Sequence, residues 1–594
     1  MQGSGNMSGR DGKTVTRMFS SRKRYGTPAF VIAIGIAAAA AAQPAPAPSV
    51  QPAQTGKIGQ FADYLAGRQA QHVRDFQSAA TWYEAALAAD PDSPELVSRT
   101  FLMEVSAGHF ARARALADSE IKIDPSDAIA QLVLMVDRLK AGDQPGALAR
   151  AAALPHDGIH RLVAPLALSW VRMAGGDLAG ADTALQGLDK YNGFAPLKLF
   201  QLGLLYDFAG QPDKAQTYLS KAIDASGQLN WRLTDAMANF YERHGRQSDA
   251  EALYKRFIQQ TSGNELAESV LATRPTGSAP QPFIKSARDG LAEAFFDLAS
   301  VLNQNETVDL ALLYDRFALD LKPDFRLAQL LLADVLSSED KPDESLAVLA
   351  GIPATSPYFW SARLRSATDL EMLDRKDEAL AQLKQMAAEA PTRAGADVEL
   401  GDLLRNEKRF SEAADAYDEA IKRTAAAGLP ERWILFYDRG VSLERSGQWK
   451  KAEADLLHAL ELKPDQPLVL NYLGYSWVDR GENLDRGLKM IEKAVELRPE
   501  DGYIVDSLGW AYYKLGDYGR AVGYLEKAIE LVPQDPTIND HLGDVYWQTG
   551  RQTEARYQWR RALQFGPQQD EIKPIEAKLE NGLQPPAPPA PRGG

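Results

Sequence analysis

Along most of the chain, hydrophobic residues recur at the three- and four-residue spacing of amphipathic helices, with short polar breaks between them. Three consecutive segments show this best: NYLGYSWVDRGENLDRGLKMIEKAVELRPED, YIVDSLGWAYYKLGDYGRAVGYLEKAIELVPQD and INDHLGDVYWQTGRQTEARYQWRRALQFGPQQ. Each predicts a helix, a turn with Gly, a second helix and then Pro, which cannot continue a helix. Pro464, Pro499, Pro533 and Pro567 lie 35, 34 and 34 residues apart. We therefore predict an all-α chain of repeated helical pairs.

This unit resembles the tetratricopeptide repeat, a helix–turn–helix of about 34 residues. We aligned the chain on the eighth repeat position in the first helix, which is usually small: Gly67, Phe101, Met135, Ser169, Gly203, Ala238, Ala299, Ala333, Ala367, Gly401, Gly440, Gly474, Gly509 and Gly543. In the second helix, all fourteen equivalent residues are Ala, Ser or Gly: Ala79, Ala113, Ala147, Ala181, Ala215, Ala250, Ala311, Ser345, Ala379, Ala413, Ala452, Gly487, Ala521 and Ala555. Small residues let neighbouring helices approach closely.

The resemblance implies a right-handed superhelical solenoid of about 14 repeats. The phase breaks between Ala238 and Ala299, which are 61 residues apart. We interpret residues 262–283 as a flexible linker between an N-terminal lobe at 57–261 and a C-terminal lobe at 284–567.

Two features complete the predicted C-terminal lobe. Five extra residues near TAAAGLP interrupt the spacing between the Gly401 and Gly440 repeats. In residues 568–582, Ile572, Ile575 and Leu579 occur at helical spacing, which predicts a capping helix over the open end of the solenoid. Residues 583–594 are Pro-rich and predict a disordered tail.

The N-terminus is typical of an export signal. Within residues 1–42, six basic side chains and one acid precede the apolar run AFVIAIGIAAAAAA. This run ends in small residues suited to cleavage near Ala42. Met18 begins a more usual signal length, so residues 1–17 are interpreted as an over-long gene start. The alternative is an uncleaved anchor, the one route to membrane contact; both interpretations place the body outside the cytoplasm. Residues 43–56, rich in Pro and Ala, predict an extended linker.

The composition argues against several kinds of function. The chain has 594 residues, no Cys and a net charge of -14, which argues against nucleic-acid binding, cysteine chemistry and a lipid-modified Cys anchor. No catalytic motif occurs, and no cofactor is expected. His156 and His160 have only Asp157 as acidic company, so a metal site is not predicted. No segment outside the repeats is long enough for a catalytic domain, so we expect a protein that is not an enzyme.

Binding of other proteins is the function that this architecture favours. By resemblance to the family, repeat positions 2, 5, 9, 12 and 13 face the concave groove of the solenoid. In the C-terminal lobe these positions predict an aromatic and acidic partner-binding groove made by Tyr437, Asn471, Tyr475, Tyr503, Asp506, Trp510, Tyr513, Lys514, Asp540 and Trp547. A one-residue error in phase would exchange this set with core positions, where we expect Trp477, Leu508, Tyr512 and Tyr546.

A more specific resemblance covers about residues 465–565. The run YLGYSWVDRGENLDRGLKMIEKAVELRPEDGYIVDSLGWAYYKLG, followed by HLGDVYWQTGRQTEARYQWRRAL, is similar to the C-terminal repeats of large Gram-negative envelope tetratricopeptide proteins. Characterised members of one such group are outer-membrane lipoproteins that join a periplasmic carboxyl-terminal processing protease to cell-wall hydrolases. The resemblance implies an exported periplasmic adaptor. This chain departs from the group because it has no Cys and hence no lipid anchor.

One alternative is another kind of interaction protein. A structural part of an envelope assembly, such as polysaccharide export or secretion, would carry the same repeats. Deletion would then abolish a surface product, whereas loss of an adaptor would stabilise protease substrates. The sequence leaves the oligomeric state and the partners open.

Overall fold

The computed structural model describes residues 57–261, 264–273, 280–304 and 307–583. The predicted signal at 1–42, the linker at 43–56 and residues 584–594 of the predicted tail lie outside the described residues. The described chain is all-helical, with thirty α-helices, one short 3-10 helix and no strand. None of these helices is both long and apolar enough to span a bilayer.

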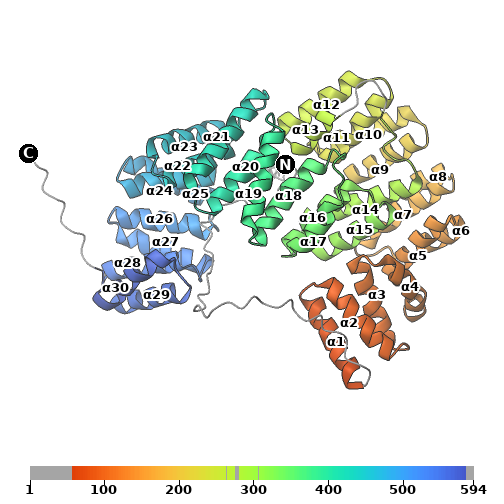
Figure 1. Cartoon of the computed structure of the whole chain (residues 1–594), viewed down its shortest axis with the longest axis horizontal. Helices are drawn as coiled ribbons and strands as arrows, with labels where there is room; N and C mark the ends of the chain where they lie inside the picture. Colours follow the sequence, from red (N-terminus) through yellow and green to blue (C-terminus); the bar gives the residue numbers. More distant parts are fainter. Residues whose placement is uncertain (1–56, 262–263, 274–279, 305–306, 584–594) are drawn as a thin grey trace, which may run out of the picture. The chain divides into compact units, whose positions relative to one another are not determined.

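Fourteen helical pairs follow one another, and successive pairs lie side by side within each of two compact units (Figure 1). The N-terminal unit ends at Gln382 and the C-terminal unit begins at Leu383, so the division falls within α19. The pairs up to this division are α1 (Lys57–His72) with α2 (Phe76–Ala89), α3 (Pro94–Ala107) with α4 (Phe110–Ile123), α5 (Ala128–Ala141) with α6 (Gln144–Ala152), α7 (His160–Ala174) with α8 (Leu178–Gln186), α9 (Ala195–Phe208) with α10 (Pro212–Ser226), α11 (Trp231–Arg243) with α12 (Gln247–Gln260), α14 (Ala287–Gln304) with α15 (Val308–Leu321), α16 (Arg326–Ser338) with α17 (Pro342–Ala350), and α18 (Phe359–Met372) with α19 (Lys376–Glu389).

The C-terminal unit continues the series and ends in an unpaired helix. Its elements are α20 (Gly395–Asn406) with α21 (Phe410–Ala426), α22 (Trp433–Arg445) with α23 (Trp449–Leu462), α24 (Pro467–Arg480) with α25 (Leu484–Leu497), α26 (Gly502–Lys514) with α27 (Tyr518–Leu531), α28 (Pro536–Gln548) with α29 (Gln552–Gln564), and α30 (Gln569–Asn581). The tetratricopeptide-type solenoid predicted from the sequence is confirmed.

The small residues that set the phase are buried at helix crossings. A Cβ atom at Gly401 would come within 2.6 Å of the ring of Tyr417, and one at Gly543 within 2.4 Å of the indole of Trp559. The large residue four positions after the small residue of the second helix therefore fills the space beside the first helix. The same contact recurs at Gly440 with Leu456 and at Gly509 with Leu525, so in these repeats the sequence pattern reports the packing directly.

The structure differs from the predicted linker at 262–283. Within that segment, α13 (Glu265–Thr273) forms and contacts α12 and α18. Helices on the two sides of the segment also pack together, since α14 contacts α7 and α9, and α15 contacts α3. An ion pair between Arg232 and Glu293 joins α11 to α14. The predicted lobe boundary rested on repeat spacing, which carries no information about such long-range contacts.

Two other irregularities have local explanations. The extra residues near TAAAGLP lengthen α21 to 17 residues, where the preceding second helix α19 has 14. At the C-terminus, α30 packs on α29 and buries Ile575, while Leu579 packs against the core of the last repeats. This confirms the predicted capping helix.

Candidate functional site

The helices α7, α9 and α11 are the first helices of three successive pairs in the N-terminal unit. Helix α14 packs on α7 and α9 and forms an ion pair with α11. Gly290 of α14 lies against the indole of Trp170 on α7, where the absence of a side chain permits close approach. Nε1 of Trp170 donates to Oε1 of Gln201 at 2.8 Å, and Nε2 of Gln201 donates to Oδ2 of Asp297 on α14 at 2.7 Å. A chain of hydrogen bonds thus ties α7 and α9 to α14.

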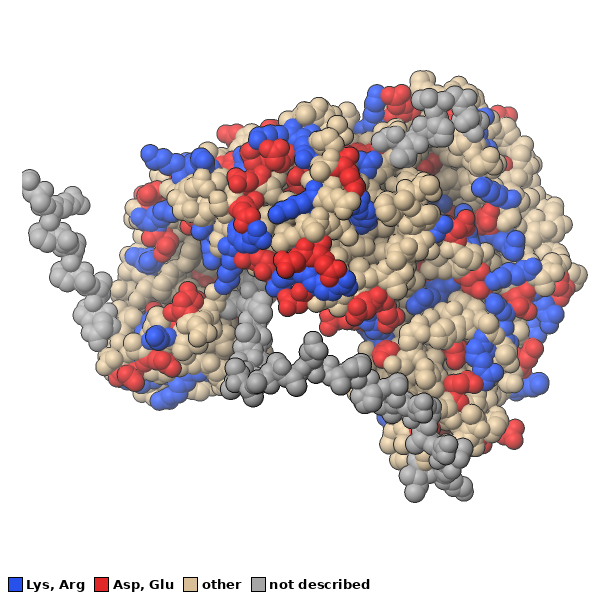
Figure 2. All heavy atoms as spheres, in the orientation of Figure 1, with Lys and Arg blue, Asp and Glu red and all other residues tan. Residues whose placement is uncertain are grey.

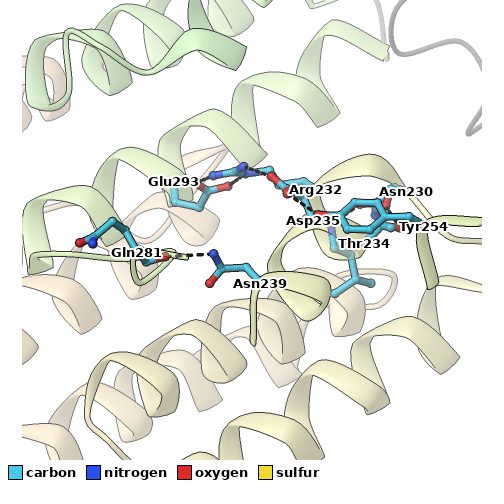
Figure 3. Close-up of polar contacts among 9 residues, drawn as sticks. Asn230, Arg232, Thr234, Asp235, Asn239, Tyr254, Gln281 and Glu293 are labelled. Carbon is cyan, nitrogen blue, oxygen red and sulfur yellow. Dashed lines mark hydrogen bonds and ion pairs between the residues drawn. The ribbon is translucent and has the colours of Figure 1, made fainter. Parts of the chain in front are cut away.

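Arg232 of α11 is the centre of a second set of contacts with α14. Its guanidinium forms a bidentate ion pair with Glu293 of α14 and donates to Oδ2 of Asp235 at 3.2 Å (Figure 3). Tyr254 of α12 donates to the other oxygen of Asp235 at 2.9 Å. Glu293 is only 1% exposed, and such a buried charge requires its partner. The face that would serve as a binding groove in this unit is therefore occupied by the chain itself.

Further contacts close the same unit at its N-terminal repeats. The rings of Phe110 and Phe317 lie 5.1 Å apart, joining α4 to α15. Asp320 of α15 accepts from both Arg114 and Lys140, at 3.2 and 3.0 Å. Helix α15 therefore packs on α4 and forms ion pairs with α4 and α5.

In the C-terminal unit, several first helices carry aromatic residues, most of which retain exposed surface. We use the name aromatic face for Tyr437 on α22, Tyr475 on α24, and Tyr503, Trp510 and Tyr513 on α26. Tyr475, Trp510 and Tyr513 are half-buried, and Tyr503 is 36% exposed. Tyr437 is only 7% exposed and packs edge-on against Tyr472, so it supports the face from beneath.

A ring stack organises the centre of the aromatic face. Trp510 stacks on Tyr513 at 4.6 Å and on His541 of α28 at 3.9 Å between ring centroids. Nδ1 of His541 lies 3.0 and 3.1 Å from the two carboxylate oxygens of Asp506 on α26. Burial alone would lower the pKa of His541, but the charge of Asp506 and that of the nearby Asp540 outweigh it and raise this pKa. Burial also raises the pKa of Tyr513 to about 12.

The predicted acidic character of the groove is largely neutralised by internal partners. Nζ of Lys578 on α30 lies 2.8 Å from Asp540 and 2.8 Å from Asp544. Lys514 pairs with Asp479 at 3.1 Å, and Asp506 pairs with His541. Repeat positions alone could not reveal these partners, because Lys578 belongs to the capping helix, outside the repeats.

The two remaining predicted groove residues have different surroundings. Trp547 packs against Trp559 and under the guanidinium of Arg556, and Gly582 closes over its ring, so it contributes to the C-terminal end of the core. Asn471 is half-buried, and its Oδ1 atom is buried without a hydrogen-bond partner in the described part of the chain. Binding of a partner by any of these residues stays a prediction.

Charge and metal-ligand patterns add no second site. On the face shown in Figure 2, Lys and Arg side chains are interspersed with Asp and Glu. Among the described residues, no three His, Asp or Glu side chains gather as a metal ion would require. His160 begins α7, where burial lowers its pKa.

Comparisons with known proteins agree with the repeat architecture. A tetratricopeptide repeat family model matches residues 200–265, 364–430, 473–536 and 507–570. The chain is 32% identical over 123 residues to the TPR repeat-containing protein PA4667 of Pseudomonas aeruginosa. That match covers 21% of this chain and 20% of the relative's length. Tetratricopeptide repeats are therefore confirmed, and the fold is one that suggests a protein–protein interaction scaffold.

Solved structures with similar helical arrays include the Cut9–Hcn1 assembly of the APC/C, with 15% identity, a TM-score of 0.39 and coverage of 88% of this chain and 96% of that chain. Yeast Tom70 has 14% identity and a TM-score of 0.34, covering 88% of this chain and 95% of that chain. YrrB, whose structure is described as having an unusual peptide-binding site, has 23% identity and a TM-score of 0.25, covering 29% and 86%.

Proposed function

We propose that this tetratricopeptide-repeat chain is a non-enzymatic interaction scaffold that binds client proteins on the aromatic face of its C-terminal unit. One observation carries the proposal. In the N-terminal unit, α14 packs on the first helices α7 and α9 and forms an ion pair with α11, whereas Tyr475, Tyr503, Trp510 and Tyr513 retain exposed surface in the C-terminal unit. Half-exposed aromatic side chains offer large contact area at low entropic cost, which is why they dominate many interfaces.

In its finer form, the proposal is an exported envelope adaptor that presents substrates to a periplasmic carboxyl-terminal processing protease. The resemblance of residues 465–565 to envelope adaptors supports it, as does the export-type pattern of residues 1–42. The internal pairing of Asp506, Asp540 and Asp544 supports an aromatic rather than a charge-based mode of client binding.

Affinity capture of the tagged chain 43–594 from a Gram-negative envelope extract tests this function. We expect the processing protease and cell-wall hydrolases to be retained by the wild type and lost from a Trp510→Ala, Tyr513→Ala double variant. Tyr557→Ala is the matched control, because Tyr557 is 56% exposed on the second helix α29. Recovery of export or secretion components without a protease would refute the adaptor function and support an assembly scaffold. Equal capture by wild type and the double variant would refute the aromatic face as the site.

A further inference from the structure

A small cavity lies in the N-terminal unit between the first helices and the helix that covers them. It has a volume of about 150 Å³, and its walls come from α9, the end of α10, α11, α14 and α16. The aromatic side chains of Phe200, Trp231 and Phe296 line it, each at most 6% exposed. Leu197 and Val301 also line it and are half-buried, so the cavity lies near the surface.

One carboxyl group at this cavity, that of Asp297, forms no ion pair in the described part of the chain and feels only the shared charge of Arg232. Asp297 lines the cavity and accepts a hydrogen bond from the amide of Gln201. The nearby guanidinium of Arg232 is already committed to Glu293 and Asp235 (Figure 3). Among the described residues, no cation forms an ion pair with Asp297. The cavity is therefore lined by three aromatic rings, the carboxyl group of Asp297 and the guanidinium of Arg232. The single charge of Arg232 acts on three carboxyl groups, those of Glu293, Asp235 and Asp297, so negative charge remains in excess.

An unpaired carboxylate is unfavourable in such a place. Burial, and then the charge of Glu293, raise the pKa of Asp297 well above its usual range, so the empty cavity favours the protonated acid. A cation entering the cavity would add a second counter-charge to the one that Arg232 supplies. Aromatic rings attract cations through their negative faces, which adds to the attraction of the carboxylate.

We propose that this cavity binds a compact alkylammonium group on a short apolar body, with Asp297 as its counter-ion and Phe200, Trp231 and Phe296 as aromatic walls. The size fits, since an apolar protein cavity of about 150 Å³ can hold a molecule as large as benzene. The inference is independent of the proposed client site, because every lining residue belongs to the N-terminal unit.

Binding is coupled to the release of one proton. The neutral acid of Asp297 gives its proton to solvent as the ammonium enters, and a carboxylate–ammonium pair remains. Affinity for an alkylammonium should therefore rise about tenfold per pH unit below the raised pKa of Asp297 and level off above it. A neutral ligand of the same shape should show no such dependence.

Calorimetric titration of the full chain tests the proposal, with n-butylammonium as the probe and 1-butanol as its neutral isostere. At pH 8 we expect butylammonium to bind about tenfold more tightly than butanol. Asp297→Asn should remove that preference and the pH dependence while leaving butanol binding unchanged; the Asn carbonyl can still accept from Gln201. Asp224→Asn, at an exposed acid on α10, should behave as wild type.

Equal affinities for butylammonium and butanol, or an unchanged preference in Asp297→Asn, would overturn the proposal. If Asp297→Asn fails to fold, the pH titration of the wild type decides: a flat affinity for butylammonium across the pH range refutes the site. Val301→Trp, which fills the cavity from its rim, should abolish binding of both probes.

The ammonium could come from a free amine or from a lysine side chain of a bound protein. Nα-acetyl-lysine N-methylamide distinguishes the sources in the same titration. Binding of this blocked lysine at the affinity of butylammonium supports the site as a receptor for a partner's lysine. Binding of butylammonium alone supports the site for a free amine.

Discussion

Gly290 of α14 lies against the indole of Trp170 on α7, and a Cβ atom at position 290 would come within 2.3 Å of the ring. The two residues are 120 positions apart in the sequence, beyond the reach of the repeat pattern. Their contact brings α14 onto the first helices of the N-terminal repeats. In the N-terminal unit this contact helps α14 to cover the first helices, whereas in the C-terminal unit the aromatic face keeps exposed surface.

Gly290→Ala should destabilise the N-terminal unit, although alanine is the better helix former. Overpacking a tight contact costs about 1–3 kcal/mol of the free energy of unfolding. Urea unfolding followed by circular dichroism measures the loss, and hydrogen exchange should show faster exchange in α7 and α14. Gly523→Ala is the matched control, because nothing lies within 4 Å of a Cβ at that helical glycine. An unchanged midpoint for Gly290→Ala would contradict the contact.

Lys578→Met should weaken the attachment of the capping helix. It leaves Asp540 and Asp544 without their shared cation, and an unsatisfied, largely buried acid costs about 1–3 kcal/mol. Differential scanning calorimetry should show a lower melting temperature for the transition that includes α28 and α30. Lys573→Met, at an exposed position of the same helix, controls for charge. If both variants melt alike, Lys578 has no special role.

The pairing of His541 with Asp506 predicts a pH dependence. The folded-state pKa of His541 is raised, so its stabilising contribution is fully present below the unfolded-state value of about 6.5 and is lost as pH rises through the folded-state value. In His541→Gln, the free energy of unfolding of the C-terminal unit should no longer fall as the pH rises through the folded-state pKa of His541. Urea midpoints measured from pH 6 to pH 9 provide the check, and His72→Gln on α1 is an exposed control. A wild-type profile as flat as that of His541→Gln would contradict the ion pair.

The contact between α24 and α25 gives a prediction for the C-terminal unit. A Cβ at Gly474 would lie 2.7 Å from the carbonyl oxygen of Gly487, and one at Gly487 would lie 2.8 Å from that of Gly474. The obstacle is backbone, which cannot rotate away. Either substitution by Ala should cost about 1–3 kcal/mol, measured by urea unfolding. The double variant should cost no more than the sum, since each forces the same helices apart. A neutral single variant would contradict the packing.

The sequence predicts the repeating part of the fold well because a small residue in the second helix marks every helical pair. Trp477 and Tyr512, expected in the core, are 1% and 3% exposed. Ile575 is buried as the capping helix requires. Trp477 and Tyr512 are predictable because they occupy recurring core positions, and Ile575 because it lies on the apolar side of an amphipathic helix.

The candidate sites were less predictable. Lys578 neutralises Asp540 and Asp544 from outside the repeats, and His541 occupies a position that the family groove pattern does not include. Asp297 of α14 meets Gln201 of α9, and Glu293 of α14 meets Arg232 of α11, through contacts that no periodicity reports. One unusual buried residue can be recognised from the sequence alone. Asp315 replaces the large or apolar residue found at its repeat position in other second helices, and it is buried with neither carboxylate oxygen hydrogen-bonded in the described structure.

The most direct test of client binding on the aromatic face is site-specific photocrosslinking. Tyr503, 36% exposed on α26, and Tyr557, 56% exposed on α29, are each replaced by p-benzoylphenylalanine in the tagged chain 43–594. Both variants are irradiated in envelope extract, and the crosslinked proteins are identified by mass spectrometry. If clients bind on the aromatic face, we expect the client proteins retained by the wild type to crosslink at position 503 and not at position 557. Crosslinking at position 557 alone would contradict it.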